Sequence, residues 1–98
     1  MNAQFKKGAL EICVLSQLSK GGYELTEVIS KEMSIAAGTL YPILKKLKDE
    51  LYVETYLVEG EGGPARKYYH LTEKGRNYQG TLKLEWQAFV EAVDRLID

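Results

Sequence analysis

The chain has 98 residues, of which 45% are hydrophobic and 28% are charged, and its formal net charge is −1. This length suits one small domain, and the composition is that of an ordinary soluble protein with no apolar run near the roughly 20 residues that span a bilayer. Because Cys13 is the single cysteine, neither an internal disulfide nor a cysteine-based zinc site can form, so we expect a cytoplasmic protein with no metal, other cofactor or membrane association.

Two helices are predicted in the first third of the sequence. Residues 3–19 form the first, whose apolar positions go most of the way round the helix, and Gly21 follows as a terminating signal. Residues 23–31 form a short second helix, with inward positions Leu25, Val28 and Ile29. Since the first helix is apolar on several sides, we expect other elements to cover more than one of them.

A third helix is predicted over residues 35–50, with Ser34 as its N-cap. At 100° per residue its inward positions are Leu40, Ile43, Leu44 and Leu47. The opposite side carries Gly38, Thr39, Tyr41, Pro42, Lys45 and Lys46. Inside this helix Pro42 would lose the bond to the Gly38 carbonyl, so a slight bend is expected.

That opposite side has the groups that contact double-stranded DNA. Hydroxyls can reach base edges, lysines neutralise phosphates, and a glycine allows close approach. Lysines on an exposed helix face often do no more than interact with water, and the lysines alone would favour that interpretation. The glycine, the hydroxyls and the hairpin that follows favour a helix that reads DNA.

A two-stranded hairpin is predicted next, from residues 52–58 and 66–71 around a glycine-rich tip. One face carries Val53, Thr55 and Leu57 on the first strand and Tyr69 and Leu71 on the second. Arg66 and Lys67 start the return strand directly after the tip. Because successive strand residues face opposite sides, the two cations of a DNA-binding wing would differ in role: Arg66 would reach into a minor groove and Lys67 would contact a phosphate.

Thr72 is placed to cap a long final helix. A heptad-like seam runs along it through Tyr78, Leu82, Trp86, Phe89, Val93 and Leu96. A helix of some 24 residues is about 36 Å long, more than a small domain can cover. We therefore expect a homodimer packed through this seam, and a twofold dimer predicts an inverted-repeat operator.

The element order is three helices, a hairpin and one long helix, which predicts a mainly helical α+β fold of the winged helix-turn-helix type. In this interpretation residues 1–71 are the winged helix-turn-helix DNA-binding domain. Residues 72–98 are a C-terminal dimerisation helix, and the two parts form one continuous fold unit.

Three stretches, "GTLYPILKKLKDE", "GGPARKYYHLTEKG" and "EWQAFVEAV", together resemble the PadR-like family of bacterial transcriptional regulators, from about Gly8 to the end. The resemblance implies a homodimeric repressor released from its operator by a small aromatic or drug-like ligand, in the short subfamily with a single C-terminal helix. It places the recognition pattern on Gly38 to Pro42 with Lys45 and Lys46, the wing on Gly62, Gly63 and Arg66 to Tyr69, and ligand stacking on Trp86. Leu51 stands where the family usually has a glycine, so the helix end there should be strained or built differently.

Two other interpretations compete with a DNA-binding regulator. Nucleophilic catalysis by Cys13 and His70 is disfavoured, because the cysteine lies in an apolar helix and the histidine points outward on a strand. An enzyme is therefore not expected. The remaining alternative is a winged-helix domain that acts as a ligand sensor or protein-interaction module without direct DNA readout.

Overall fold

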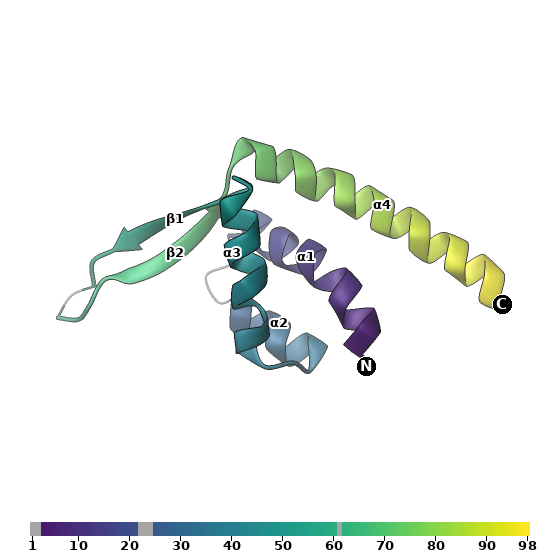
Figure 1. Ribbon diagram of the computed structural model, residues 1–98, viewed down its shortest axis with the longest axis horizontal. Helices are drawn as coiled ribbons and strands as arrows, with labels where there is room; N and C mark the ends of the chain where they lie inside the picture. Colours follow the sequence, from purple (N-terminus) through teal and green to yellow (C-terminus); the bar gives the residue numbers. More distant parts are fainter. Residues whose placement is uncertain (1–2, 22–24, 61) are drawn as a thin grey trace.

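The structure is a computed structural model that describes residues 3–21, 25–60 and 62–98, without the side chains of residues 3–8, 66 and 67. Its elements are α1 (Ala3–Ser19), α2 (Leu25–Met33), the 3-10 turn η1 (Ala37–Thr39), α3 (Tyr41–Asp49), β1 (Val53–Val58), β2 (Arg66–Leu71) and α4 (Glu73–Ile97). This is the predicted order, and the predicted mainly helical winged-helix class is confirmed. The hairpin extends from one side of the helices, and α4 runs away from it towards the other (Figure 1).

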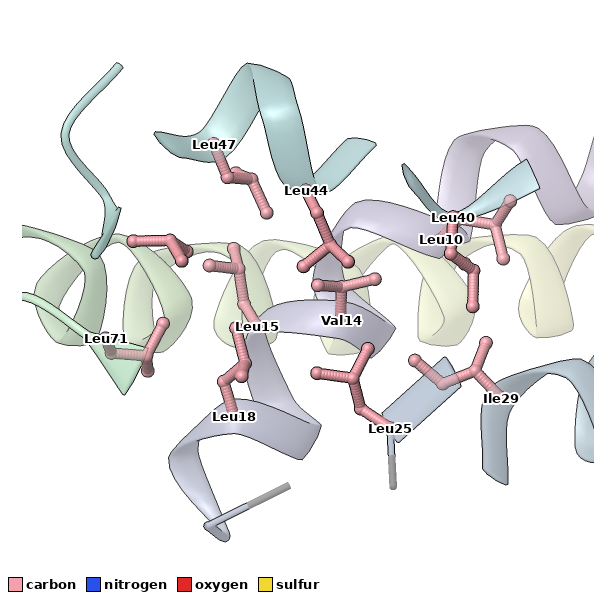
Figure 2. Close-up of a cluster of buried hydrophobic side chains, with 11 residues drawn as sticks. Leu10, Val14, Leu15, Leu18, Leu25, Ile29, Leu40, Leu44, Leu47 and Leu71 are labelled. Atoms are coloured by element: carbon pink, nitrogen blue, oxygen red, sulfur yellow. The ribbon is translucent and has the colours of Figure 1, made fainter. Parts of the chain in front are cut away.

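The core lies between α1, α2, α3 and the base of the hairpin. Figure 2 shows its side chains, which are mostly leucines and are contributed by each of these elements. Helix α1 contacts α2, α3, β2 and α4, as its nearly all-round apolar surface predicts. The predicted inward positions of the third helix are also right: Leu40, Leu44 and Leu47 are buried, and Ile43 packs against them.

The predicted second helix needs one correction. Leu25 and Ile29 are buried, but Val28 is 40% exposed instead of facing inward. Residues 23 and 24, the predicted start of this helix, lie outside the described residues. Helix α2 therefore buries a narrower stripe than its apolar pattern indicates.

The predicted start of the third helix was wrong in two respects. Ser34 is no N-cap: it has a φ of 53° and ends α2, where the Ile35 N–H donates to the Ser30 carbonyl at 3.0 Å. Helix α3 begins only at Tyr41, after η1, so Pro42 lies in its first turn. An N–H there has no partner within the helix, so the proline costs no hydrogen bond and no bend is required.

Leu51 adopts the left-handed conformation that its place in the sequence suggested. Its φ is 66°, its N–H donates to the Lys48 carbonyl at 3.0 Å, and the Tyr52 N–H donates to the Leu47 carbonyl at 2.9 Å. These two bonds form a Schellman motif, which usually has glycine at the left-handed position. Helix α3 therefore ends in the same way as it would with glycine at position 51, and the cost is strain in the Leu51 backbone.

Replacing Leu51 with glycine should therefore stabilise the protein. The side chain is 67% exposed, so little packing is lost, and relief of the left-handed strain should raise the free energy of unfolding by about 1 kcal/mol. Leu51→Ala is the matched control, because alanine keeps the Cβ that causes the strain. Urea unfolding measures both variants, and an equal effect of the two would contradict this account of the strain.

The hairpin packs on the core only at its base. In the antiparallel register Val53 pairs with Leu71, and both are buried, whereas Leu57 is 70% exposed. The hairpin face that carries Val53, Leu57 and Leu71 is thus buried at the base and uncovered towards the tip. The other face carries the stacked rings of Tyr56 and Tyr68, whose centroids are 5.6 Å apart. The outer half of the hairpin therefore projects as a wing with both faces open.

The end of α3 is fastened to the start of α4. The predicted cap is present, since Thr72 Oγ1 accepts from the Gly75 N–H at 3.0 Å, and the same hydroxyl donates to the Leu51 carbonyl at 2.7 Å. Lys74 Nζ donates to the Glu50 carbonyl at 2.9 Å. We call these contacts the α3–α4 latch. They fix the long helix relative to the helix predicted to read DNA.

Candidate nucleic-acid interface

The residues predicted for the recognition helix form one exposed surface at η1 and the first turns of α3. All six are exposed, opposite the buried leucines of the same segment: Gly38, Thr39, Tyr41, Pro42, Lys45 and Lys46. The late start of α3 makes the first two part of a turn instead of a helix. Hydroxyl, aromatic and cationic groups are thus presented together by a short turn and a rigid helix.

A groove of about 370 Å³ lies beside this surface, between α3 and the base of the hairpin. Its lining residues are Tyr41, Leu44, Lys45, Lys48, Asp49 and Tyr69. Lys48 was not among the predicted contacts. It could have been included, because it lies close to Lys45 on the helix surface, three residues further along. Tyr69, which the resemblance placed in the wing, is partly buried against the core.

The two lysines of the predicted surface each have an acidic neighbour. Lys45 Nζ lies 3.5 Å from Asp49 Oδ2, one turn along α3. Lys46 Nζ lies 3.5 Å from Glu11 Oε2 on α1. Both lysine side chains are more than half exposed, so each pair is weak and can be exchanged for a phosphate.

The wing cations hold the register positions next to the tip. Arg66 pairs with Val58 and Lys67 with Leu57, so the two alternate along β2 as predicted. Their side chains lie outside the described residues. The hairpin that carries them starts beside the C-terminal end of α3 (Figure 1). The base of the hairpin and the end of α3 therefore lie next to each other in the fold (Figure 1).

The seam of α4 has a packed part and an uncovered part. Tyr78 and Leu82 pack against the core of their own chain, and the Tyr78 ring stacks on Tyr52 with centroids 4.2 Å apart. Further along, Phe89 is 60% exposed and Leu96 84% exposed. Val93 is half-buried, and Trp86 contacts Phe89 at a centroid distance of 6.0 Å. The half of the helix beyond Trp86 thus presents an apolar side to solvent.

Trp86 also borders an open groove of about 540 Å³ between α1, α2 and α4. The walls include Ile12, Cys13, Val28, Met33 and Lys83. Burial raises the pKa of the Cys13 thiol above its ordinary value, so the thiolate that would act as a nucleophile is disfavoured. His70 is far along the chain, on the hairpin, where Nε2 lies 2.9 Å from Glu54 Oε2. Cys13 in the α1 groove and His70 on the hairpin thus have separate surroundings.

The Tyr78 hydroxyl joins α4 to α1 and is unusually weakly acidic. It donates to Glu11 Oε1 at 2.7 Å, and this bond, together with burial and nearby negative charge, raises the pKa of Tyr78 to about 12. Between pH 10 and 12 the folded state therefore holds a proton that the unfolded state has lost. This contribution to stability is complete below pH 10 and is lost as the pH rises towards 12.

Glu11→Ala should lower the pKa of Tyr78 towards that of an ordinary tyrosine. The hydrogen bond to the carboxylate is the largest cause of the raised pKa, the carboxylate charge adds to it, and alanine removes both. Tyrosinate absorbance at 295 nm, compared between the parent protein and the variant, measures the change. Tyr78→Phe identifies the contribution of this ring by removing it. A Tyr78 titration that is the same in the parent and in Glu11→Ala would show that the bond does not control the acidity.

Among the residues that the structure describes, none of the helices is long and apolar enough to cross a bilayer. The described His, Cys, Asp and Glu side chains also form no group of three suited to a metal ion.

The fold and the exposed α3 surface define a winged helix-turn-helix protein, and comparison with known proteins specifies the family. Residues 12–81 match the family described as "Transcriptional regulator PadR-like family". The chain belongs to this family, as the three sequence stretches predicted. Its structural neighbours are transcriptional regulators, not enzymes, which confirms the non-enzymatic prediction.

Two solved structures and one sequence relative illustrate the similarity. A PadR-like transcriptional regulator from Bacillus cereus has a TM-score of 0.85 and 34% identity, covering 98% of both chains. A Streptococcus transcriptional regulator has a TM-score of 0.84 and 28% identity, covering 99% of this chain and 100% of the other. A Lysinibacillus sphaericus protein named "Uncharacterized protein X" is 31% identical over 81 residues, 79% of this chain and 74% of that protein.

Proposed function

We propose that the protein is a homodimeric repressor that binds an inverted-repeat operator in double-stranded DNA and leaves it when a small aromatic ligand binds. The observation that carries the DNA-binding part is the exposed surface of η1 and α3, whose hydroxyls and lysines have no structural duty in the core. A net charge of −1 gives no general attraction to DNA, so binding must depend on this local surface.

The roles of the contacts follow from their chemistry. Thr39 and Tyr41, at the start of α3, can reach base edges and set sequence preference. Lys45 and Lys46 neutralise phosphates, and so does Lys67 in the wing, while Arg66 reaches into the minor groove. The dimer presents two copies of α3 to half-sites about one turn of DNA apart.

Gel-shift titration with the upstream region of the protein's own gene tests this function. Binding should be specific and should weaken steeply between about 50 and 200 mM salt, because lysines displace counterions from phosphates. Lys45→Ala should weaken binding to all duplexes alike, whereas Tyr41→Phe should change the preference among them. Affinity that ignores both salt and sequence would instead support an interaction module without DNA readout.

The ligand part of the proposal rests on Trp86. This residue is 41% exposed and borders the groove between α1, α2 and α4, so a flat apolar molecule can contact it. Aromatic compounds that bind should quench its fluorescence, which reports on one site because the chain has a single tryptophan. The same compounds should reduce operator binding. A broad aromatic panel that leaves the emission spectrum unchanged would remove Trp86 from the site.

A further inference from the structure

Both carboxylate oxygens of Glu11, in α1, are engaged by side chains of other helices. Tyr78 in α4 donates its hydroxyl proton to Oε1 at 2.7 Å. Lys46 Nζ in α3 lies 3.5 Å from Oε2. The Glu11 side chain is 27% exposed, while that of Lys46 is 58% exposed. One partly buried carboxylate therefore connects the long helix to a cation of the candidate DNA-binding surface.

The geometry points to Glu11 as a positioning residue that holds Lys46 back from DNA and so sets the affinity of the protein for its operator. This inference rests on the proposed function. It assigns the repressor a built-in restraint: the phosphate contact of Lys46 forms only when its bond to Glu11 is given up.

Glu11 differs from Asp49, the other acidic neighbour of the surface. Asp49 belongs to the same helix as its partner Lys45, and both side chains are more than 60% exposed, so that pair can move together towards DNA. Glu11 cannot follow Lys46 in this way. Its other oxygen is bound by Tyr78, whose ring is stacked on Tyr52 with an angle of 15° between the ring planes. The carboxylate is thus anchored while the lysine is able to leave.

The strength of the restraint is moderate. A largely exposed ion pair contributes roughly 0.2–1 kcal/mol, which corresponds to a change in affinity of up to about fivefold. Each phosphate that a lysine neutralises contributes about 0.9 to the slope of log affinity against log salt. While Lys46 is paired with Glu11, it contributes less than this amount to the slope. Once released from Glu11, it contributes the full amount.

The test is a double-mutant cycle with Glu11→Gln and Lys46→Gln on the full-length protein. The probe is a duplex of the protein's own upstream region, titrated at several salt concentrations. Glu11→Gln should raise affinity about two- to fivefold and steepen the salt slope by up to about 0.9. The same change in the Lys46→Gln background should have no effect on the slope. A purely structural role of Glu11 would alter thermal stability and leave the slope unchanged.

Asp49→Asn is the matched control, because it removes the same charge from the same surface. It should change affinity equally with and without Lys46, which measures the general effect of one carboxylate near DNA. If Glu11→Gln proves unfolded, Glu11→Asp shortens the side chain by one methylene, moves the carboxylate away from Lys46 and should steepen the slope to a smaller extent.

The outcomes separate the two proposals. Specific binding in which Glu11→Gln acts equally in both backgrounds overturns the role of Glu11 and leaves the proposed function standing. Failure of every protein in the cycle, the parent included, to bind the duplex overturns both.

Discussion

Gly75→Ala is expected to destabilise the protein by about 3 kcal/mol, because the added methyl group meets backbone atoms. A Cβ built at Gly75 would lie 2.0 Å from the Tyr52 carbonyl oxygen and 2.9 Å from its carbon. Both are backbone atoms, so no side chain can rotate to relieve the clash. Overpacking of this kind costs about 1–3 kcal/mol, and we expect the upper end because the α3–α4 latch must open to admit the methyl group.

Gly80→Ala, in the same helix, is the control with the opposite expected sign. A Cβ at Gly80 would have no atom within 4 Å, and alanine is favoured over glycine inside a helix by about 0.5–1 kcal/mol. Thermal or urea unfolding of the two variants should therefore move in opposite directions. Similar stabilities would show that α4 does not begin in close contact with Tyr52.

Phe89→Glu should convert the proposed dimer into a monomer and reduce operator affinity by at least about 100-fold. Phe89 is 60% exposed on the uncovered part of the seam. In the proposed dimer this seam would be buried, and burying a charge without a partner is strongly destabilising. A monomer retains one α3 surface and loses the second, linked binding event, which accounts for the large loss. Sedimentation analysis measures the oligomeric state, and gel-shift titration measures the affinity.

Leu84→Glu is the matched change on the other side of the same helix. Leu84 is 69% exposed. It precedes Trp86 by two residues, so the two side chains are separated by roughly 200° around the helix axis. This variant should remain dimeric and bind the operator. Dimers from both variants would refute the seam as the interface, and a monomeric parent protein would refute the dimer itself.

The sequence predicted the architecture because its strongest signals were local ones. The leucines of α3, the capping threonine at position 72 and the glycine-rich tip each report on the nearest few residues, and all three were interpreted correctly. The PadR-like stretches then named the family. The errors lie where two local structures compete: Ser34 suits an N-cap, yet it closes α2 in a left-handed conformation instead.

Contacts between distant segments could not be predicted in this way. Glu11 contacts Lys46 and Tyr78 only because α1 packs against both α3 and α4. No residue near Glu11 in the sequence indicates these contacts. The same holds for Gly75, whose need for a bare α-carbon comes from the Tyr52 carbonyl, 23 positions earlier. For Tyr78, heptad spacing indicated the interface between copies, whereas its ring also stacks within its own chain.

The α3–α4 latch has a consequence for the operator. Thr72 and Lys74 donate to the carbonyls of Leu51 and Glu50, so the end of α3 is joined directly to the start of α4. In the proposed dimer, the distance between the two reading helices would then be set by the fold of each chain and not by a flexible joint. One inserted base pair turns a half-site by about 34–36° and moves it about 3.4 Å along the duplex. Such a protein would bind operators with one half-site spacing and would bind poorly when that spacing is changed.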